Sequence, residues 1–375
     1  MKNILILITK GETGGAQVSV FNLANTLKKK GYRVTVGFGQ GTFLQDKLAT
    51  HNIPYHQFKH LLRTHNPLST VRFIYELRVY LKQHSFTSLH CNSSNTLPGV
   101  LATFFLRQKP TTIFTFRGLS LIDKNYQEGN RLLKTLYSWY FKFFLHFTDH
   151  CVLVSKENMD QIKTMKLPSH TSVIYNGLDP KELNFFDSKE ARTVLKLKTG
   201  TSLEGKFIIG SIGRLSYQKN YEFLIQHWPQ IQQSIPNALL VIIGGGPDEE
   251  KLHAQMLTTK GNEQIHLLGD MPDAYTYLRG FDCFVLPSRY EGLSIVLLET
   301  LFAGTPVIAT DVNSNAEVLG NAGLVYPLDN IDIFLTHIQK LTHREIREEM
   351  SRQATLRSNM FHIENTVDGY LKLYT

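Results

Sequence analysis

Cysteine is scarce in this sequence, with three residues among 375. Cys91, Cys151 and Cys283 are odd in number and far apart, which excludes a disulfide framework of the kind that small secreted proteins use. Uninterrupted apolar runs are also short, and none approaches the roughly 18 residues of a membrane-spanning helix. We therefore expect a protein of the reducing cytoplasm that has no membrane-spanning segment.

The sequence also offers little for metals, redox cofactors or nucleic acids. The turn from Gly244 to Pro247 has the glycines of a dinucleotide loop, but the acids Asp248 and Glu249 follow it and would repel a pyrophosphate, so we expect no nicotinamide or flavin cofactor. No nucleic-acid recognition motif is present. A group of histidines lacks nearby cysteine or carboxylate ligands, and we predict no metal site there; its members are His51, His56, His60 and His65.

Charge is divided unevenly along the chain. Residues 1–185 carry 23 Lys and Arg against 10 Asp and Glu, a net charge of +13, whereas residues 186–375 carry 17 against 22, a net charge of −5. We expect the first half to face an anionic partner. The chain is longer than one hydrophobic core usually serves, so two domains are predicted.

Short apolar runs alternate with helical patterns throughout, which is typical of parallel sheets built from βαβ units. The fold class is therefore α/β, with two Rossmann-like, doubly wound domains facing across a cleft. Residues 1–185 form the first domain, 186–355 the second, and 356–375 a helix that crosses back to the first. Strands are expected near 3–8, 33–38, 87–91, 111–116, 151–154, 207–211, 239–243, 265–268, 282–286 and 306–309, with helices at about 16–30, 69–84 and 124–148.

The most informative segment runs from Tyr290 to Glu299, between two predicted strands. It reads as a turn and a buried helix, with Glu291 ahead of the helix and Glu299 inside it. Glu299 lies among apolar residues and needs a ligand, and the two hydroxyls of a ribose suit a carboxylate that only accepts hydrogen bonds. The alternative is a helix glutamate bonded to a neighbouring side chain.

Two further loops follow predicted strands. Arg214 and Lys219 lie five residues apart after the strand at 207–211, where a guanidinium fork and an ammonium suit a diphosphate; exposed surface cations are the alternative. Gly14 and Gly15 follow the first strand and directly precede a helix, so their N–H groups are available to a phosphate or a sugar hydroxyl. A tight strand-to-helix turn explains the same glycines, and both interpretations can hold.

In this order, these motifs resemble the family 4 retaining glycosyltransferases, which have the GT-B architecture. The resemblance spans nearly the whole chain and implies an enzyme that uses a nucleotide sugar, with no cofactor. No Asp-x-Asp sequence occurs, which fits a site without a metal. The motifs are Gly14-Gly15, Asn176 to Asp179, Gly213-Arg214 with Lys219, Gly244 to Pro247, Glu291 to Glu299, and Ala303 to Asp311 with Glu317.

The resemblance also implies the roles of individual residues. Glu299 would hold the ribose, Arg214 and Lys219 the diphosphate, and Glu291 the hydroxyls of the transferred sugar. The segment Ile265 to Gly269, including Leu268, would read a uracil or guanine base. The remaining donor-binding candidates are Gly14, Gly15, Gly213, Gly246, Gly292, Leu293 and Ser294.

One position departs from the family pattern. Many members have a histidine in a Thr-x-His-Gly setting after the fourth strand, where this chain has Arg117 followed by Gly118. A guanidinium keeps its charge and cannot act as a base. Arg117 therefore joins Arg214, Lys219 and Glu291 as a catalytic candidate that bonds a sugar hydroxyl or a phosphate.

The acceptor is expected to bind the first domain, because acceptor choice in this family belongs there. Projected as a helix, residues 124–148 place Lys124, Arg131, Lys134 and Lys142 on one side and mostly aromatic and leucine residues on the other. That pattern fits a helix at the surface of an anionic membrane, and equally a helix whose apolar side packs on the sheet. A second basic stretch contains Arg63, Arg72, Arg78 and Lys82.

The leading hypothesis is a transferase that moves a hexose or N-acetylhexosamine from a UDP-sugar to a polyprenyl-diphosphate-linked glycan, in surface polysaccharide synthesis. The protein would then be peripheral on the inner face of the plasma membrane. One alternative is a transferase with a soluble small-molecule or protein acceptor. Another is an inactive GT-B module that serves as a binding partner, which the presence of Arg214, Lys219, Glu291 and Glu299 argues against.

Overall fold

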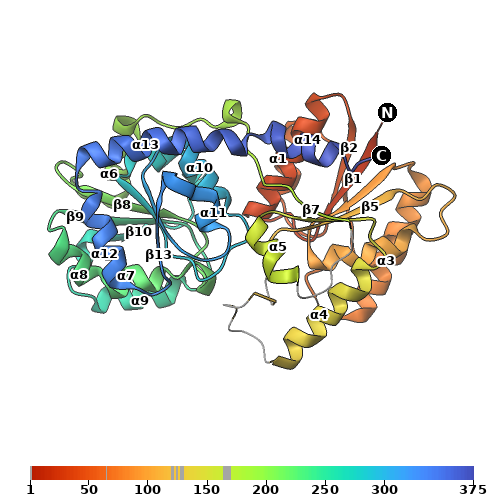
Figure 1. The fold of residues 1–375 in the computed structure, drawn as a ribbon, viewed down its shortest axis with the longest axis horizontal. Coiled ribbons are helices and arrows are strands. Elements are labelled where there is room, and N and C mark those ends of the chain that lie inside the picture. The colour runs from red at the N-terminus through yellow and green to blue at the C-terminus, as the bar shows by residue number, and fades with distance from the viewer. Residues whose placement is uncertain (1, 65, 120–121, 124–125, 127–130, 164–169) are drawn as a thin grey trace. The chain divides into compact units, whose positions relative to one another are not determined.

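The computed structural model describes residues 2–64, 66–119, 122–123, 126, 131–163 and 170–375, which form two compact units (Figure 1). Unit 1 comprises Met1–Asp179 and Phe361–Thr375, and unit 2 comprises Pro180–Met360. The boundaries differ by a few residues from the sequence estimates of 185 and 355. The C-terminal segment thus belongs to the same unit as the first half of the chain.

Unit 1 is built on a parallel sheet that has seven strands within the described residues, in the order β3-β2-β1-β4-β5-β6-β7. One face packs on α1, α2 and α14, and the other on α3, η1, α4 and α5. The elements are β1 (Asn3–Ile8), α1 (Gly15–Lys29), β2 (Arg33–Phe38), α2 (Phe43–Thr50), β3 (Tyr55–Gln57), α3 (Pro67–Gln83), β4 (Ser88–Cys91), the 3-10 helix η1 (Ser94–Thr103), β5 (Thr111–Phe116), α4 (Arg131–Leu145), β6 (His150–Leu153), α5 (Lys156–Lys163), β7 (Thr171–Val173) and α14 (Ile363–Leu371).

Unit 2 repeats the arrangement with a sheet of six strands in the described part of the chain, ordered β10-β9-β8-β11-β12-β13. Its elements are α6 (Ser188–Thr199), β8 (Phe207–Ile212), η4 (Tyr217–Lys219), α7 (Tyr221–Gln226), α8 (Trp228–Ser234), β9 (Ala238–Ile243), α9 (Glu249–Thr258), η5 (Asn262–Gln264), β10 (Ile265–Leu267), η6 (Ala274–Gly280), β11 (Cys283–Leu286), α10 (Ile295–Ala303), β12 (Val307–Thr310), α11 (Asn315–Leu319), η7 (Gly320–Ala322), β13 (Leu324–Tyr326), α12 (Ile331–Lys340), α13 (Arg344–Ser358) and η8 (Asn359–Phe361), which reaches the first residue of the returning segment.

The apolar runs explain why these strands form the core of each unit. The residues of β8 and β9 are all buried, as expected for parallel strands covered on both faces. Local signals set the helix ends: Asn66 caps α3 through a 2.9 Å bond from Leu68 N, and Gly200 ends α6 in the left-handed conformation. The predicted fold class, two Rossmann-like sheets, is confirmed.

The C-terminal segment is an integral part of unit 1. In Figure 1 the blue helix α14 lies beside the red helix α1, and Leu178 pairs with His362 at its start. Tyr370 and Tyr374 are fully buried. Hydrogen bonds between the Tyr374 hydroxyl and His90 Nδ1 (2.8 Å), and between Thr115 and Tyr370 (2.9 Å), fix the segment to the sheet.

Candidate functional site

The candidate residues of unit 2 gather at one edge of its sheet. Strands β9, β8, β11 and β12 are neighbours and run parallel, so the loops that follow them emerge at the same edge. Ligands of such sheets bind at the carboxyl ends of the strands. The loop after β8 supplies Lys219, and the loop after β11 supplies Glu291.

Lys219 and Glu291 form a buried ion pair. The Lys219 ammonium lies 2.6 Å from Glu291 Oε1, and the two side chains are 14% and 6% exposed. Ser288 also donates to Oε1, at 2.7 Å, whereas Oε2 receives, among the described residues, only a long 3.4 Å bond from Gln218. The acid and the cation, which we expected to bind different parts of one ligand, are thus in direct contact. Oε2 has lone pairs for a further donor, such as a sugar hydroxyl.

Arg289 holds the segment that carries Lys219. Its guanidinium lies 4.2 Å from the ring centroid of Tyr217, donates to the Tyr217 carbonyl at 2.8 Å, and pairs with Glu222. Its backbone N–H donates to the Gln218 carbonyl at 2.8 Å. The β11 loop therefore fixes η4 from two sides. The sequence analysis missed this role, because the residues next to Arg289 in sequence do not indicate that its side chain connects two loops.

The backbone of Glu291 is fixed by a buried asparagine. Glu291 N donates to Asn313 Oδ1 at 3.1 Å, and Ser314 donates to the Gly292 carbonyl at 2.5 Å. Both residues follow β12 and are fully buried. The only available sequence signal was their place after a buried strand in a set of small polar residues, Asn313, Ser314 and Asn315.

The glycine loops pack against one another. Gly213 N donates to the Ile243 carbonyl (3.0 Å), and Leu215 N donates to the Gly245 carbonyl (2.9 Å). A Cβ on Gly246 would lie 2.2 Å from the Leu215 carbonyl oxygen, so this position requires glycine for the close approach of two backbones. Leu268 N is bonded to the Ile242 carbonyl at 2.9 Å and extends β10 by one residue.

Glu299 lies about one turn into α10 and is partly buried. Burial, and secondarily the nearby charge of Asp273, raise its pKa to about 7. Within the described residues no hydrogen bond or ion pair joins Glu299 to another side chain, so the alternative of a neighbouring partner gains no support. Gly292, Leu293 and Ser294 precede α10, and Ser294 makes no side-chain cap there. Arg214 is exposed, and no described carboxylate pairs with it.

Unit 1 presents its own candidates at the carboxyl ends of its strands. Gly14 precedes α1 and Gly15 begins it; a Cβ on Gly14 would lie 2.7 Å from Gln17 Oε1. Arg117 follows β5 and donates to two side-chain oxygens, those of Asn92 and Asn176. The sequence analysis noted Asn176 only as the first residue of the motif Asn176 to Asp179.

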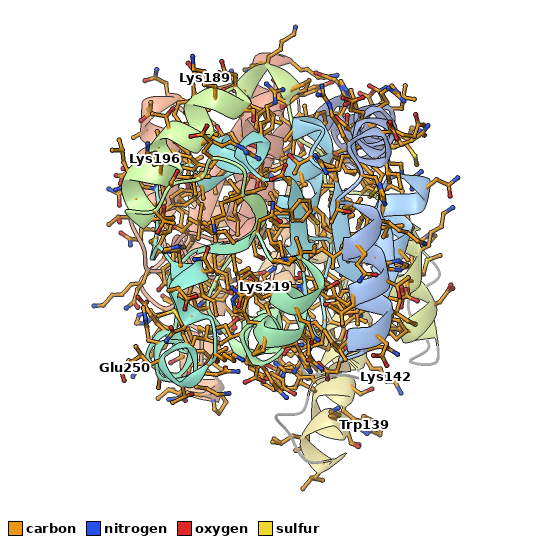
Figure 2. The ribbon with its side chains drawn as sticks, turned by 90° about the vertical axis from the view of Figure 1, so that its left-hand side faces the viewer. Trp139, Lys142, Lys189, Lys196, Lys219 and Glu250 are labelled. Atoms are coloured by element: carbon orange, nitrogen blue, oxygen red, sulfur yellow. The ribbon has the colours of Figure 1, made fainter. Side chains whose placement is uncertain are left out.

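The helix α4 is apolar on more than one side. Its buried residues are Phe141 and Leu145, while Leu132 (64%) and Trp139 (69%) are among its exposed ones. In Figure 2 the part of α4 that carries Trp139 protrudes from the rest of unit 1. Apolar residues of α4 therefore lie both on the sheet and in solvent, and the two expected arrangements stay predictions; Lys124 and the side chain of Arg131 lie outside the described residues. The other exposed apolar residues of α4 are Leu133, Leu136 and Phe143.

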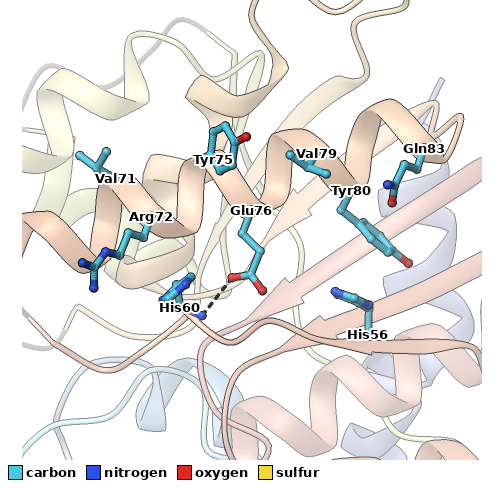
Figure 3. Close-up of a pocket in the computed structure, with 9 residues that line it drawn as sticks. All are labelled: His56, His60, Val71, Arg72, Tyr75, Glu76, Val79, Tyr80 and Gln83. Atoms are coloured by element: carbon cyan, nitrogen blue, oxygen red, sulfur yellow. Dashed lines mark hydrogen bonds between the residues drawn. The ribbon is translucent and has the colours of Figure 1, made fainter.

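A groove of about 650 Å³ lies beside α3 (Figure 3). His56 stacks on Tyr80 with ring centroids 4.2 Å apart, and burial lowers the His56 pKa. Glu76 accepts from the backbone of His60 at 3.0 Å. Two of the four histidines considered as metal ligands are thus lining residues of an apolar groove, and His65 lies outside the described residues. The exposed apolar residues of α3 are Leu68, Val71, Tyr75 and Val79.

Within the described residues, no helix is both long and apolar enough to cross a bilayer.

Comparison with known proteins identifies the family. Residues 13–182 match the family described as Glycosyltransferase Family 4, and residues 196–357 match Glycosyl transferases group 1. The chain therefore belongs to the family 4 glycosyltransferases with the GT-B fold.

Individual relatives are similar over most or part of the chain. One is the Escherichia coli UDP-Gal:alpha-D-GlcNAc-diphosphoundecaprenol alpha-1,3-galactosyltransferase, 27% identical over 84% of this chain and 81% of its own. Another is the Campylobacter jejuni N-acetylgalactosamine-N,N'-diacetylbacillosaminyl-diphospho-undecaprenol 4-alpha-N-acetylgalactosaminyltransferase, 27% identical over 55% of this chain and 54% of its own. The crystal structure of Anabaena HepE in complex with UDP and glucose shares the fold, with a TM-score of 0.82 and 18% identity over 99% of both chains.

Proposed function

We propose that this glycosyltransferase moves a hexose or N-acetylhexosamine from a UDP-sugar to a polyprenyl-diphosphate-linked glycan, with retention of anomeric configuration and without a metal. The observation that carries the proposal is the Lys219–Glu291 pair, 2.6 Å apart, at the sheet edge where α10 begins. A cation and an acid in contact suit the junction between a sugar and its diphosphate.

The donor is assigned mainly to unit 2. Glu299 accepts from the ribose hydroxyls, since an ionised carboxylate offers two acceptors to two neighbouring donors. Lys219 and the exposed Arg214 bind the diphosphate, with the N-terminal N–H groups of α10 beside it. Glu291 Oε2, the carboxylate oxygen with the weaker hydrogen bonding, accepts from a hydroxyl of the transferred sugar.

Catalysis then depends on positioning and electrostatics. Attack from the same face as the departing phosphate retains configuration and needs no protein nucleophile. Lys219 neutralises the charge that builds up on the leaving diphosphate. Its own position is set by Arg289 and Glu291, so little reorganisation accompanies the reaction.

The acceptor is assigned to unit 1. The names of the Escherichia coli and Campylobacter jejuni relatives both describe acceptors linked to diphosphoundecaprenol. The net charge of +13 on residues 1–185 suits a substrate that carries a diphosphate and lies on an anionic membrane.

Peripheral membrane association is the second part of the proposal. Nearly all the strongly exposed large apolar side chains of the described part of unit 1 lie on α3, on α4 or just after η1, which pack on one face of the sheet. Phe105, which follows η1, is 93% exposed, and the guanidinium carbon of Arg78 lies over its ring, 6.0 Å from the centroid. Apolar residues bordered by Arg78 and Lys142 are the composition of a surface that inserts into an anionic interface.

A transferase with a soluble acceptor is the alternative within the same family. It would use the same donor site but would have no need of the exposed apolar side chains of α3 and α4. An inactive module is disfavoured, because the Lys219–Glu291 pair and its supporting bonds from Ser288 and Asn313 are all present.

The test is a panel of nucleotide sugars, screened first by thermal stabilisation and then for transfer to a synthetic polyprenyl-diphosphate-linked sugar. We expect UDP and at least one UDP-sugar to raise the melting temperature by mass action, and transfer to proceed in the presence of a chelator. Failure of every uridine nucleotide to bind would contradict the donor assignment, and transfer only to soluble acceptors would favour the alternative.

A further inference from the structure

Arg117 is held in a neutral cradle at the carboxyl end of β5. Its Nε and Nη2 donate to Asn92 Oδ1 at 2.9 and 2.7 Å, and its Nη1 donates to Asn176 Oδ1. Both asparagines are buried, at 1% and 4% exposure. Three bonds to two buried side chains fix the plane of the guanidinium.

No acid neutralises this cation within the described residues of the chain. Its hydrogen-bond partners are amide oxygens, which carry no net charge, and no ion pair includes Arg117. The charge of Arg117 also affects His90, which is fully buried. Burial is the larger cause that lowers the His90 pKa, and the positive charge of Arg117 is the second. A partly buried cation without a counter-ion is costly, and an anionic ligand would offset that cost.

The guanidinium retains donors for such a ligand. Of its five N–H groups, three are used by Asn92 and Asn176, which leaves one on each terminal nitrogen. A planar pair of charge-assisted donors suits a phosphoryl group with two acceptor oxygens. Aspartate at either asparagine position would fill the same space but would cancel the charge.

We propose that Arg117 binds a phosphate or diphosphate group of one of the two substrates. The inference rests on the proposed function, because it draws the ligand from a nucleotide sugar or a lipid-linked diphosphate. It extends that function by assigning a phosphate contact to unit 1, in addition to the site at Lys219.

The experiment has two calorimetric arms. In the first, UDP is titrated into the apoprotein; in the second, inorganic pyrophosphate is titrated into protein already saturated with UDP. The variants are Arg117→Gln and Asn176→Asp, the second of which keeps the arginine but supplies a counter-charge. Arg33→Gln is the matched control, because Arg33 is exposed at the opposite end of the same sheet.

If Arg117 contacts the acceptor diphosphate, both variants weaken pyrophosphate binding by roughly tenfold or more and leave the affinity for UDP within about twofold. If it contacts the donor, UDP binding weakens by that factor and UDP-saturated wild type shows no pyrophosphate site. Unchanged binding in both arms, with folding verified by circular dichroism, would overturn the proposal. Absence of UDP binding to wild type would instead count against the proposed function.

Discussion

The ammonium of Lys219 and the carboxylate of Glu291 lie 2.6 Å apart in a largely buried setting, although 72 residues separate them in sequence. Removing one partner leaves the other buried without compensation, so substitutions here affect stability as well as chemistry.

We predict that Lys219→Met and Glu291→Gln each lower transfer by about a hundredfold or more, since each removes a charge placed for the transition state. Lys219→Met also leaves an unpaired buried carboxylate, at a cost of about 3 kcal/mol in the free energy of unfolding. The double variant should regain part of that stability but none of the activity. Denaturant unfolding and initial rates test both points, and additive losses of stability would show that the ion pair does not form.

The raised pKa of Glu299 predicts a pH dependence of nucleotide binding. A carboxyl with a pKa of about 7 is mostly protonated at pH 6 and ionised at pH 8, and only the ionised form accepts from both ribose hydroxyls. The affinity for UDP should therefore rise by several-fold over this range. Glu299→Gln is the control, because any titration of UDP itself affects both proteins equally. The change in UDP affinity between pH 6 and pH 8 should be larger for the wild type than for this variant.

The same shift affects the unliganded protein. The folded state holds this proton more tightly than the unfolded state, whose pKa is near 4.5, so stability falls as pH rises from about 4.5 to about 7. Glu299→Gln should remove this part of the pH dependence. Melting temperatures measured without nucleotide across pH 5 to 8 give the comparison, and parallel curves for the two proteins would contradict a raised pKa.

Arg289 is predicted to act by positioning η4. Arg289→Lys keeps the charge near Glu222 but loses the flat contact with Tyr217 and the bond to its carbonyl. We expect kcat to fall by roughly tenfold or more, with a smaller change in KM. Arg352→Lys is the control, because Arg352 is 67% exposed in a surface ion pair. If Arg289→Lys and Arg352→Lys have the same kcat, Arg289 does not position η4 for catalysis.

Membrane association is tested with vesicles. Trp139→Ser and Phe143→Ser should each reduce binding to vesicles that contain an anionic phospholipid, and higher salt should weaken wild-type binding. Leu257→Ser provides the control, because Leu257 is 71% exposed on unit 2. Equal binding by all four proteins would show that α4 does not contact the lipid.

Much of the fold could be predicted from sequence because each buried strand is a short apolar run with clear boundaries. The predicted strands are all present, whereas β3, β7 and β13, which have three residues each and lie at sheet edges, were missed. The helix predicted at 69–84 is also present, but it begins two residues earlier, at Pro67.

The candidate site was predictable only in part. Lys219 and Glu291 were singled out because they follow buried strands, and Glu299 because it lies among the apolar residues of a predicted helix. Their direct pairing was not foreseen, since the register between loops 72 residues apart is set by the whole sheet. Ser288 and Asn313 bond to Glu291, and Arg289 bonds to residues next to Lys219; residue type alone does not reveal such bonds.

The return of Phe361–Thr375 to unit 1 has a consequence for biogenesis. Tyr370 and Tyr374 complete a core that otherwise consists mainly of residues preceding Pro180, so all of Pro180–Met360 is synthesised in between. Unit 1 therefore lacks α14 on one face of its sheet until the end of this segment is made, whereas unit 2 is continuous in sequence and can finish folding earlier. A chaperone that shields exposed β-sheet would therefore act longest on the residues of unit 1 that precede Pro180.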